Sequence, residues 1–184
     1  PGDVDERSIV DVQPADLEGY VQCHFFAGIG GWPLALRLAG WPADRPVWTG
    51  SCPCQPFSAA GKGAGANDDR HLWPAWFPLI EDCGPAVVFG EQVAAAIRHG
   101  WLDGICADLE SADYAVGAHV LGAHSVGAPH IRQRLYWLGV AVGAGLEGHA
   151  GDGDDGGQSG RDNTESLGSI AARGGLGTWG DFDV

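Results

Sequence analysis

The segment VQCHFFAGIGGWPLALRLAG constrains the fold more than any other part of this 184-residue chain. Residues 21–27 form a short apolar run that predicts a buried strand, and glycines crowd the turn that follows at residues 28–31. Residues 32–39 are predicted to form a helix, with a proline tolerated in its first turn and Gly40 at its end. Such a turn lets backbone approach a ligand closely and directs a helix N-terminus towards it. An ordinary strand-to-helix turn explains the same residues, so the turn alone does not identify a site.

The rest of the chain continues this alternation of strands and helices. Further strands are predicted at residues 46–50, 85–90, 114–121 and 134–142, and helices at residues 71–82 and 100–113. The pattern predicts an α/β fold with a mostly parallel sheet and flanking helices, in which ligands bind at the carboxyl ends of the strands. The glycine turn, a cysteine-containing turn after residue 50 and Glu91 all fall at such ends.

Composition divides the chain into two parts. Residues 1–142 are expected to form one domain, whereas residues 143–184 are rich in Gly and Asp and are expected to be a flexible tail, because they hold too few large apolar side chains for a core. The net charge of −14 is opposite to that of a generic basic nucleic-acid binder, although a few cations at one cleft can suffice locally.

Five scattered cysteines without a secretory signal favour reduced thiols in a cytosol, and their spacing is a weak match to a zinc site, so no metal is expected. No apolar run approaches the ~20 residues that cross a bilayer.

The stretch SCPCQPFS places Cys54 in an unusually stiff turn. Prolines at positions 53 and 56 fix the backbone on either side, which preorganises the turn at the end of a predicted strand. A thiolate is a good nucleophile, and a nearby positive charge or helix N-terminus favours its formation. A buried structural thiol is the usual role of a single cysteine, but the stiff turn favours a nucleophile here.

Two further motifs supply polar groups. Glu91 follows the apolar run AVVFG, where partial desolvation suits a carboxyl that gives or shares a proton near neutral pH. Taken in isolation, Glu91 is better explained as a helix N-cap or first-turn acid. In HIRQR, alternation along an extended chain would place His130, Arg132 and Arg134 on one side, suited to a base edge or a phosphate. A solvent-exposed strand end would explain one such polar side chain better than it explains all three.

FAGIGG, then PCQPFS followed by AAGKGAGANDDRHLW, then the Glu91 strand end and Arg-x-Arg resemble, in this order, the DNA (cytosine-5)-methyltransferases. The resemblance covers residues 21–142 and implies a Rossmann-like fold that binds S-adenosylmethionine. It implies that Cys54 attacks C6 of cytosine, that Glu91 holds N3 and the exocyclic amine, and that Arg134, with Arg132 beside it, binds O2 and the adjacent backbone. The cytosine must be flipped out of the DNA duplex. The implied cofactor-binding residues are Phe26, Ala27, Gly28, Ile29, Gly30 and Gly31; the implied DNA-binding residues are Ser58, His130, and Lys62 and Arg70 of a closing loop at residues 59–70.

The chain departs from the family pattern in ways that carry predictions. Gly31 and Cys54 are too close for the two strand–helix units that usually separate these motifs. The resemblance implies a fold in which the two strands concerned are neighbours, so one short crossover is expected to join them directly. The N-terminal segment PGDVDERSI then becomes a candidate displaced cofactor-binding segment within residues 1–20, with Asp3 or Asp5 contacting the adenosine. Gln92 replaces the usual Asn and is expected to keep the turn braced.

No target-recognition domain follows Val142, which suggests a second chain or a missing domain for recognition. The resemblance therefore implies cytosine-5 methylation of DNA by a bacterial or phage-encoded cytoplasmic protein, with restriction–modification and phage DNA protection both open. Two alternatives remain. One is a catalytically incomplete subunit that binds S-adenosylmethionine or DNA, and the other is a thiol enzyme acting on free pyrimidine nucleotides.

Overall fold

The computed structural model describes residues 2–53 and 72–144. The chain separates into two units, Pro1–Ala144 and Gly145–Val184, and all described residues belong to the first. Cys54, Ser58, Lys62 and Arg70 lie outside the described residues, as does the predicted tail from residue 145 onward. No helix within the described ranges is long and apolar enough to span a membrane.

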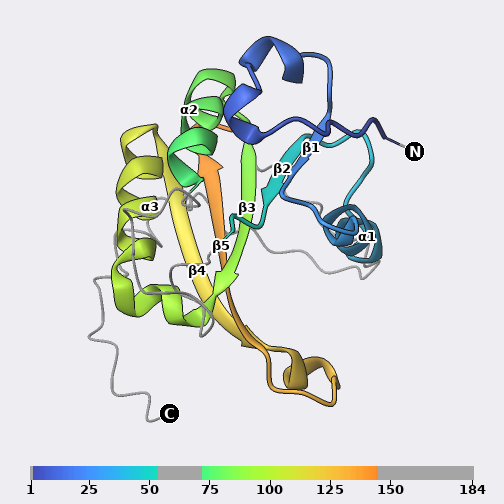
Figure 1. Ribbon diagram of the computed structural model, residues 1–184, viewed down its shortest axis with the longest axis vertical. Coiled ribbons are helices and arrows are strands. Elements are labelled where there is room, and N and C mark those ends of the chain that lie inside the picture. The colour runs from blue at the N-terminus through green and yellow to red at the C-terminus, as the bar shows by residue number, and fades with distance from the viewer. Residues whose placement is uncertain (1, 54–71, 145–184) are drawn as a thin grey trace, which may run out of the picture. The chain divides into compact units, whose positions relative to one another are not determined.

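A five-stranded sheet in the order β1-β2-β3-β5-β4 organises the first unit (Figure 1). β1 (Gln22–Phe25), β2 (Val47–Gly50) and β3 (Val87–Val93) pair in parallel. β5 (Gln133–Ala141) lies antiparallel between β3 and β4 (Tyr114–Gly122), so four of the five strands point the same way. The sheet is therefore mixed, with the predicted parallel part at β1–β3 and an antiparallel hairpin at its other side.

One crossover joins β1 directly to β2, as the short spacing between the two turns predicted. The chain leaves β1, forms α1 (Gly31–Leu38) and returns as β2, whose residue Val47 lies opposite Gln22. The glycine turn and the cysteine turn consequently leave neighbouring strands at the same edge of the sheet.

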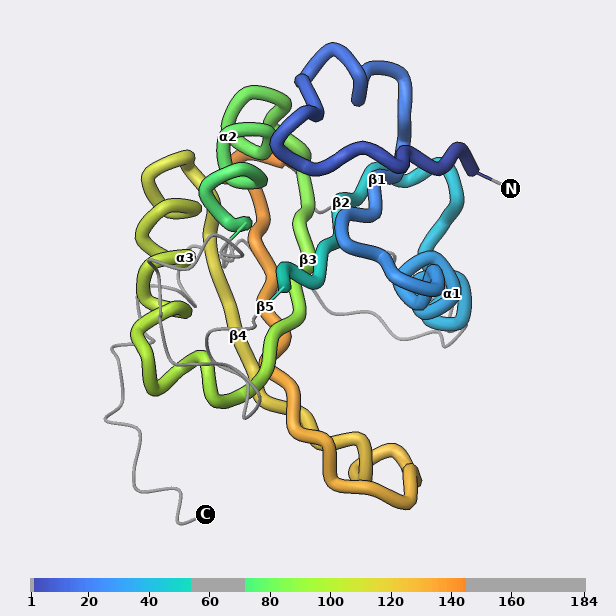
Figure 2. The backbone as a smooth tube through the Cα atoms, viewed as in Figure 1, coloured from blue at the N-terminus to red at the C-terminus, as the bar shows by residue number. Residues whose placement is uncertain are grey.

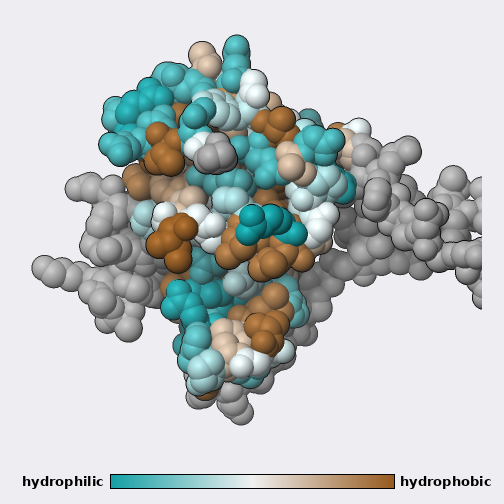
Figure 3. Space-filling model, turned by 90° about the vertical axis from the view of Figure 1, so that its right-hand side faces the viewer, coloured by the Kyte–Doolittle hydropathy of each residue, from teal (hydrophilic) through white to brown (hydrophobic). Residues whose placement is uncertain are grey.

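Helices cover the two faces of the sheet unequally. α2 (Trp73–Cys83) and α3 (Trp101–Ser111) pack on one face, while α1 lies on the other (Figures 1 and 2). Beyond α1, the second face leaves side chains of β4 and β5 at the surface, Tyr136 among them. Figure 3, which views the molecule from this side, shows apolar patches at the surface among hydrophilic ones, in keeping with the exposed Leu34 and Leu38 of α1.

Tryptophan side chains fill the core between the sheet and α2. Trp76 is fully buried and Trp137 nearly so, with ring centroids 5.9 Å apart. Two glycines that lie opposite each other, Gly50 on β2 and Gly90 on β3, provide the space: a Cβ at Gly50 would lie 2.3 Å from the Trp76 ring, and one at Gly90 would lie 1.8 Å from the Trp137 ring. These positions therefore require glycine for a steric reason and not for backbone conformation.

Ion pairs between residues of the N-terminal segment stabilise that segment. It contains two 3-10 helices, η1 (Ile9–Asp11) and η2 (Pro14–Leu17). Arg7 bonds Asp5 at 2.6 Å and Asp16 at 3.1 Å. Hydrogen bonds from Arg7 lower the pKa of Asp5 to about 2.

Candidate active site at the carboxyl edge of β1, β2 and β3

The glycine turn after β1 has the open geometry of a ligand cradle. Gly28 and Gly30 have φ angles of +55° and +79°, which glycine adopts without strain. A Cβ added at Gly28, Gly30 or Gly31 would meet no atom within 4 Å, so space lies in front of the turn. Phe26 also has a positive φ of 53°, a strained conformation for a side-chain-bearing residue. An edge-on contact of its ring with Trp76 at 6.0 Å helps to hold it.

The first residues of the cysteine turn are fixed from three sides. The Ser51 backbone N–H donates to the Phe25 carbonyl at 3.4 Å, which ties the turn to β1. The Trp32 indole N–H, in the first turn of α1, donates to the Ser51 hydroxyl at 3.0 Å. From β3, the buried Gln92 amide donates to the Cys52 carbonyl at 3.4 Å. Cys54, two residues further on, lies outside the described residues, but its turn starts between the cofactor-type glycine turn and the end of β3.

Gln92 makes the bracing contacts that the family resemblance implied for this position. Its side-chain Nε2 holds Cys52 while its Oε1 accepts a hydrogen bond from the backbone N–H of Val93 at 2.9 Å. The longer side chain thus satisfies both ends of its amide while only 3% exposed.

Glu91 and Arg134 form an ion pair on the opposite face of β3 from Gln92. The Arg134 Nε lies 2.8 Å from the Glu91 Oε1, and the two side chains are only 21% and 23% exposed. Partial burial strengthens such a pair relative to one in open water. Glu91 lies within β3, which extends to Val93, rather than just beyond the strand as the sequence suggested.

Contacts with α1 place this ion pair on the side of the glycine turn. Phe89 lies two residues before Glu91, on the same face of β3, and its ring is 6.3 Å from that of Trp32. Trp32 therefore links three parts of the site. It belongs to the helix that begins at the glycine turn, it bonds the hydroxyl of Ser51, and its ring lies near the strand that carries Glu91.

The expectation that His130, Arg132 and Arg134 align on one extended strand is wrong. β5 begins at Gln133, and Arg132 has a φ of +33°, which breaks the alternation. His130 and Arg132 are exposed in the connection before the strand, and only Arg134 joins Glu91. An alternating pattern of polar residues does not reveal that one of them has a positive φ.

Asp3 and Asp5 engage neighbours within the N-terminal segment. Asp3 accepts a hydrogen bond from the Tyr20 hydroxyl at 2.9 Å, and Asp5 is paired with Arg7. Tyr20 precedes β1, whereas the glycine turn follows the other end of that strand. Among the described residues, no hydrogen bond or ion pair joins either carboxylate to the glycine turn.

Three of the remaining thiols are poor candidates for a nucleophile. Burial raises the pKa of Cys23 to about 11, and burial followed by nearby carboxylates raises the pKa values of Cys83 and Cys106 above the usual range. Such thiols stay protonated near neutral pH. None of the three forms a disulfide, and within residues 2–53 and 72–144 no group of three metal-ligating side chains could hold an ion.

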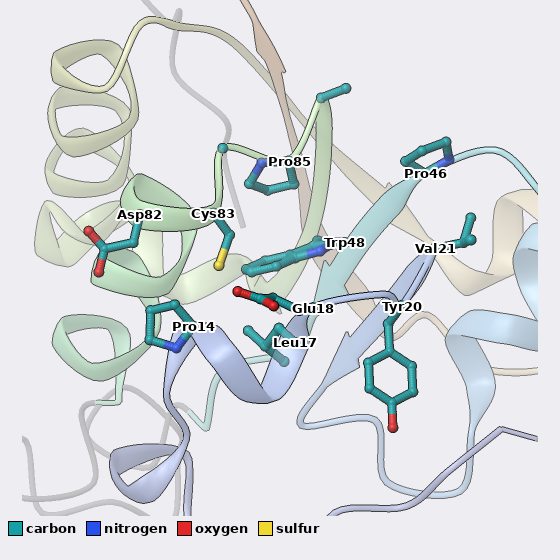
Figure 4. Close-up of a pocket in the computed structure, with 12 residues that line it drawn as sticks. Pro14, Leu17, Glu18, Tyr20, Val21, Pro46, Trp48, Asp82, Cys83 and Pro85 are labelled. Carbon is teal, nitrogen blue, oxygen red and sulfur yellow. The ribbon is translucent and has the colours of Figure 1, made fainter.

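A cavity of about 510 Å³ lies at the other end of the strands (Figure 4). Its walls include Val21, Pro46 and Pro85, which precede β1, β2 and β3, with the Trp48 ring and the Cys83 thiol between them. The strands separate it from the glycine turn, and it takes no part in the site described above.

Sequence reasoning missed two polar contacts that shape the site. Trp32 is a tryptophan in the first turn of a helix, and its hydrogen bond to Ser51 joins segments 19 residues apart. Beneath α1, His24 of β1 lies 2.8 Å from the hydroxyl of the fully buried Thr49 on β2. Burial lowers the pKa of His24. The only sequence signal for the contact between His24 and Thr49 was a histidine inside a predicted strand, next to a glycine turn.

Solved structures of known proteins share this arrangement of strands and helices. A methyltransferase from Entamoeba histolytica, EhMeth, matches with a TM-score of 0.51 and 17% identity over 66% of this chain and 52% of that chain. A DNMT2 variant from Spodoptera frugiperda matches with a TM-score of 0.52 and 17% identity over 68% and 50%. At these identities the likeness concerns the fold, which is that of Rossmann-like methyltransferases.

Curated relatives extend the comparison to sequence. Type II methyltransferase M.AplI from Arthrospira platensis is 33% identical over 159 residues, which cover 66% of this chain and 46% of that protein. Type II methyltransferase M.HhaI from Haemophilus parahaemolyticus is 25% identical over 169 residues, covering 71% and 52%. The chain thus spans about half the length of these relatives.

The family model described as C-5 cytosine-specific DNA methylase matches residues 42–158, more than half of the chain. With this match and the site geometry together, the chain belongs to the C-5 cytosine-specific DNA methylase family.

Proposed function

We propose that this protein transfers a methyl group to C5 of cytosine in DNA through a covalent adduct with Cys54. The family match and the type II methyltransferase relatives support the reaction class. The single observation in the structure that carries the proposal is the Glu91–Arg134 pair, held on the same side of the sheet as the glycine turn.

Cys54 is the nucleophile in this proposal. Its sulfur forms a bond to C6 of a flipped cytosine, and the electron pair of the C5–C6 bond moves so that C5 becomes nucleophilic. After C5 has gained the methyl group, loss of the C5 proton to a base re-forms the double bond and releases the thiolate. The three anchors on Ser51 and Cys52 would hold the start of the turn still during these steps.

Glu91 and Arg134 hold the base. The Glu91 carboxyl binds N3 and the exocyclic amine, which stabilises the ring as N3 gains a proton, and the Arg134 guanidinium donates to O2. Without substrate the two side chains form an ion pair at 2.8 Å, so neither charge is unpaired although both are partly buried. Both charged groups are therefore already in place when the base binds. Arg132 is assigned to the DNA backbone and not to the base, because it lies outside β5.

The residues of the glycine turn fit S-adenosylmethionine. The open space in front of Gly28, Gly30 and Gly31 and the N-terminus of α1 form a cradle that a Cβ would partly fill. Phe26, Ala27 and Ile29 complete this segment. When bound, S-adenosylmethionine supplies the methyl group. Asp3 and Asp5 are left out of the proposed site because of their present partners.

DNA with a flipped cytosine is the proposed substrate, with Ser58, Lys62, Arg70 and His130 as further contacts. Because the chain spans only about half of its relatives, we also propose that a second chain or a further domain supplies target recognition. We further propose that the protein acts in DNA modification in the cytoplasm, and the bacterial sources of the two type II methyltransferases support a bacterial origin.

Covalent trapping tests this proposal. The full chain is incubated with S-adenosylmethionine and a duplex that contains 5-fluorocytosine, whose C5 fluorine blocks release. A protein–DNA adduct is expected for the wild type and for Cys83→Ala, and none for Cys54→Ala. Glu91→Gln is expected to slow trapping by about 100-fold, since removal of one charged site group typically costs several kcal/mol.

The outcomes separate the alternatives. An adduct with a fluorinated mononucleotide but not with DNA would support a free-nucleotide thiol enzyme instead. Binding of S-adenosylmethionine or DNA without any adduct would indicate an incomplete subunit. An adduct that persists in Cys54→Ala would refute the assigned nucleophile.

A further inference from the structure

We propose that Trp32 is a positioning residue that couples ligand binding at the glycine turn to the placement of the turn that leads to Cys54. The inference rests on the proposed function, which supplies the identity of the ligand at the glycine turn. Its physical content is one hydrogen bond between the two turns: the Trp32 indole N–H donates to the Ser51 hydroxyl at 3.0 Å. A ligand that orders the first turn of α1 also orders Ser51 through this bond.

The position of Trp32 in the chain places it directly beside the ligand-binding turn. Trp32 is the second residue of α1 and follows the last glycine of the turn. Gly28 and Gly30 have φ angles of +55° and +79°, and the Gly30 N–H donates to the Ala27 carbonyl at 2.9 Å. Glycine loses more conformational freedom on ordering than any other residue. A ligand that contacts this turn therefore restricts the backbone immediately before Trp32 and limits the positions of its indole.

Few side chains attach α1 to the sheet. The helix lies apart from the other helices (Figures 1 and 2), and Leu36 is the one buried residue within α1, all of which the structure describes. Leu34 and Leu38 are 46% and 78% exposed, so they add little packing. An element with few buried apolar contacts lies at the low-stability end of a structure. Binding at the N-terminus of α1 can then change its order substantially, and the half-buried Trp32 passes this change to the sheet.

The ring of Trp32 also contacts the strand that carries the base-binding pair. Its centroid lies 6.3 Å from that of Phe89, which occupies the same face of β3 as Glu91. Trp41 packs edge-on against Phe89 at 6.1 Å. Movement of α1 therefore affects two strands of the site, β2 through Ser51 and β3 through Phe89.

Ser51 is the point at which the cysteine turn depends on α1. The two other anchors of the turn come from the sheet: the Ser51 N–H donates to the Phe25 carbonyl, and the Gln92 amide donates to the Cys52 carbonyl, each at 3.4 Å. Both are long for N–H···O bonds, whereas the bond from Trp32 has an ordinary length. The bond from Trp32 is thus the shortest of these three anchors, and it joins the cysteine turn to the helix of the glycine turn.

The size of the coupling follows from the strength of one hydrogen bond. The net contribution of such a bond corresponds to a factor of about 5 in an equilibrium constant. When a ligand raises the fraction of molecules in which Trp32 bonds Ser51, the ligand and the bond stabilise each other by the same factor. We therefore expect effects of about 5-fold on both the exchange of the cysteine turn and the affinity for the ligand.

Hydrogen exchange measures the coupling without any DNA. The full chain is exchanged in deuterated buffer with and without saturating S-adenosylhomocysteine, which carries no methyl group to transfer, and peptides covering residues 47–52 are followed by mass spectrometry. In the wild type the ligand should slow exchange of these amides by about 5-fold. Trp32→Phe and Ser51→Ala should each lose most of this slowing, because each removes one partner of the hydrogen bond.

Trp41→Phe is the matched control. Trp41 also packs on Phe89, but its indole N–H donates to the Arg45 carbonyl at 3.1 Å, in the connection between α1 and β2. This variant loses similar aromatic packing and should keep the ligand-dependent slowing. A general loss of stability in Trp32→Phe would speed exchange with and without ligand alike and leave their ratio unchanged. The ratio therefore separates positioning from a merely structural role.

Covalent trapping of 5-fluorocytosine DNA gives a second measurement. At saturating S-adenosylmethionine, Trp32→Phe should lower the rate constant for trapping by about 5-fold, and Ser51→Ala should not lower it further in the Trp32→Phe background. Trp41→Phe should trap at the wild-type rate. By reciprocity, the affinity of Trp32→Phe for S-adenosylhomocysteine, measured by calorimetry, should fall by a factor similar to the lost slowing.

The inference and the proposed function fail in different ways. Ligand-dependent slowing that persists in Trp32→Phe would overturn the inference, even when the wild type traps DNA. Slowing that is lost equally in Trp41→Phe would assign the effect to packing on Phe89 and overturn the role of the indole donor. The expected pattern of slowing without Cys54-dependent trapping would support the role of Trp32 and refute the methylation proposal.

Discussion

Replacing Gly90 by alanine should destabilise the protein through a clash with Trp137. The added Cβ would lie 1.8 Å from the Trp137 ring, whereas an ordinary contact is at least 3.4 Å, so ring or strand must move by 3.4 − 1.8, or about 1.6 Å. Trp137 is only 2% exposed and is packed against Trp73 and Trp76 at 5.7 and 5.9 Å, so the ring has little room to move. Overpacking of this kind costs about 1–3 kcal/mol, and the immobile ring favours the upper end.

Urea unfolding followed by tryptophan fluorescence measures this cost. We expect Gly90→Ala to lower the free energy of unfolding by about 3 kcal/mol, which corresponds to a fall in Tm of roughly 6–12 °C for a chain of this size. Gly117→Ala is the matched control, because Gly117 also lies in a strand but a Cβ there would meet no atom within 4 Å. Its effect should stay within about 1 kcal/mol and can be stabilising.

A double variant identifies the cause. Trp137→Leu removes the ring atoms that clash, so Gly90→Ala should cost about 1–3 kcal/mol less in that background than in the wild type. Equal costs in both backgrounds, or a cost for Gly90→Ala no larger than for Gly117→Ala, would refute the steric argument. Since Gly90 directly precedes Glu91, the single variant should also trap DNA more slowly than Gly117→Ala.

The remaining predictions concern hydrogen bonding and titration near the site. Trp32→Phe keeps an aromatic side chain, although a smaller one, but loses the donor to Ser51, so it should lower the free energy of unfolding by about 1 kcal/mol or more. Ser51→Ala should add little in the Trp32→Phe background, and additive costs would contradict the contact. Burial lowers the pKa of His24, so its protonation favours the unfolded chain: stability in urea should fall as pH drops below 6.5, and His24→Gln should reduce that fall. Burial raises the pKa of Cys23 from 9.0 to about 11, so stability should decline between these pH values, where the unfolded thiol ionises first, and a Cys23→Ala variant with the same decline would exclude this origin.

Local sequence patterns were sufficient to predict the main strands and helices of the fold. The strand–turn–helix at residues 22–38 and the helices at Trp73–Cys83 and Trp101–Ser111 form close to where periodicity and turn residues predicted them. These elements follow from side-chain period and turn residues, which a sequence displays directly. The prediction that β1 and β2 are neighbours also needed the fold implied by the family resemblance, together with the short spacing between Gly31 and Cys54.

Contacts between distant segments were harder to predict. The Glu91–Arg134 pair was predicted only as two separate site residues, because cross-strand register depends on the turn that joins β4 to β5. The same turn reverses the backbone at Arg132, which no polar alternation reveals. Trp32 reaches Ser51 through packing of α1 on the sheet, and such packing is decided by the whole core.

The direct crossover from β1 to β2 has a consequence for how the molecule assembles. The turn that would hold the methyl donor and the first residues of the turn that would carry the reactive sulfur come from residues 22–53, one uninterrupted stretch with a single helix inside it. Closing so short a loop costs little chain entropy, and local contacts of this kind form quickly during folding. Both halves of the pocket can therefore take shape together, before the more distant β5 strand inserts its arginine beside them.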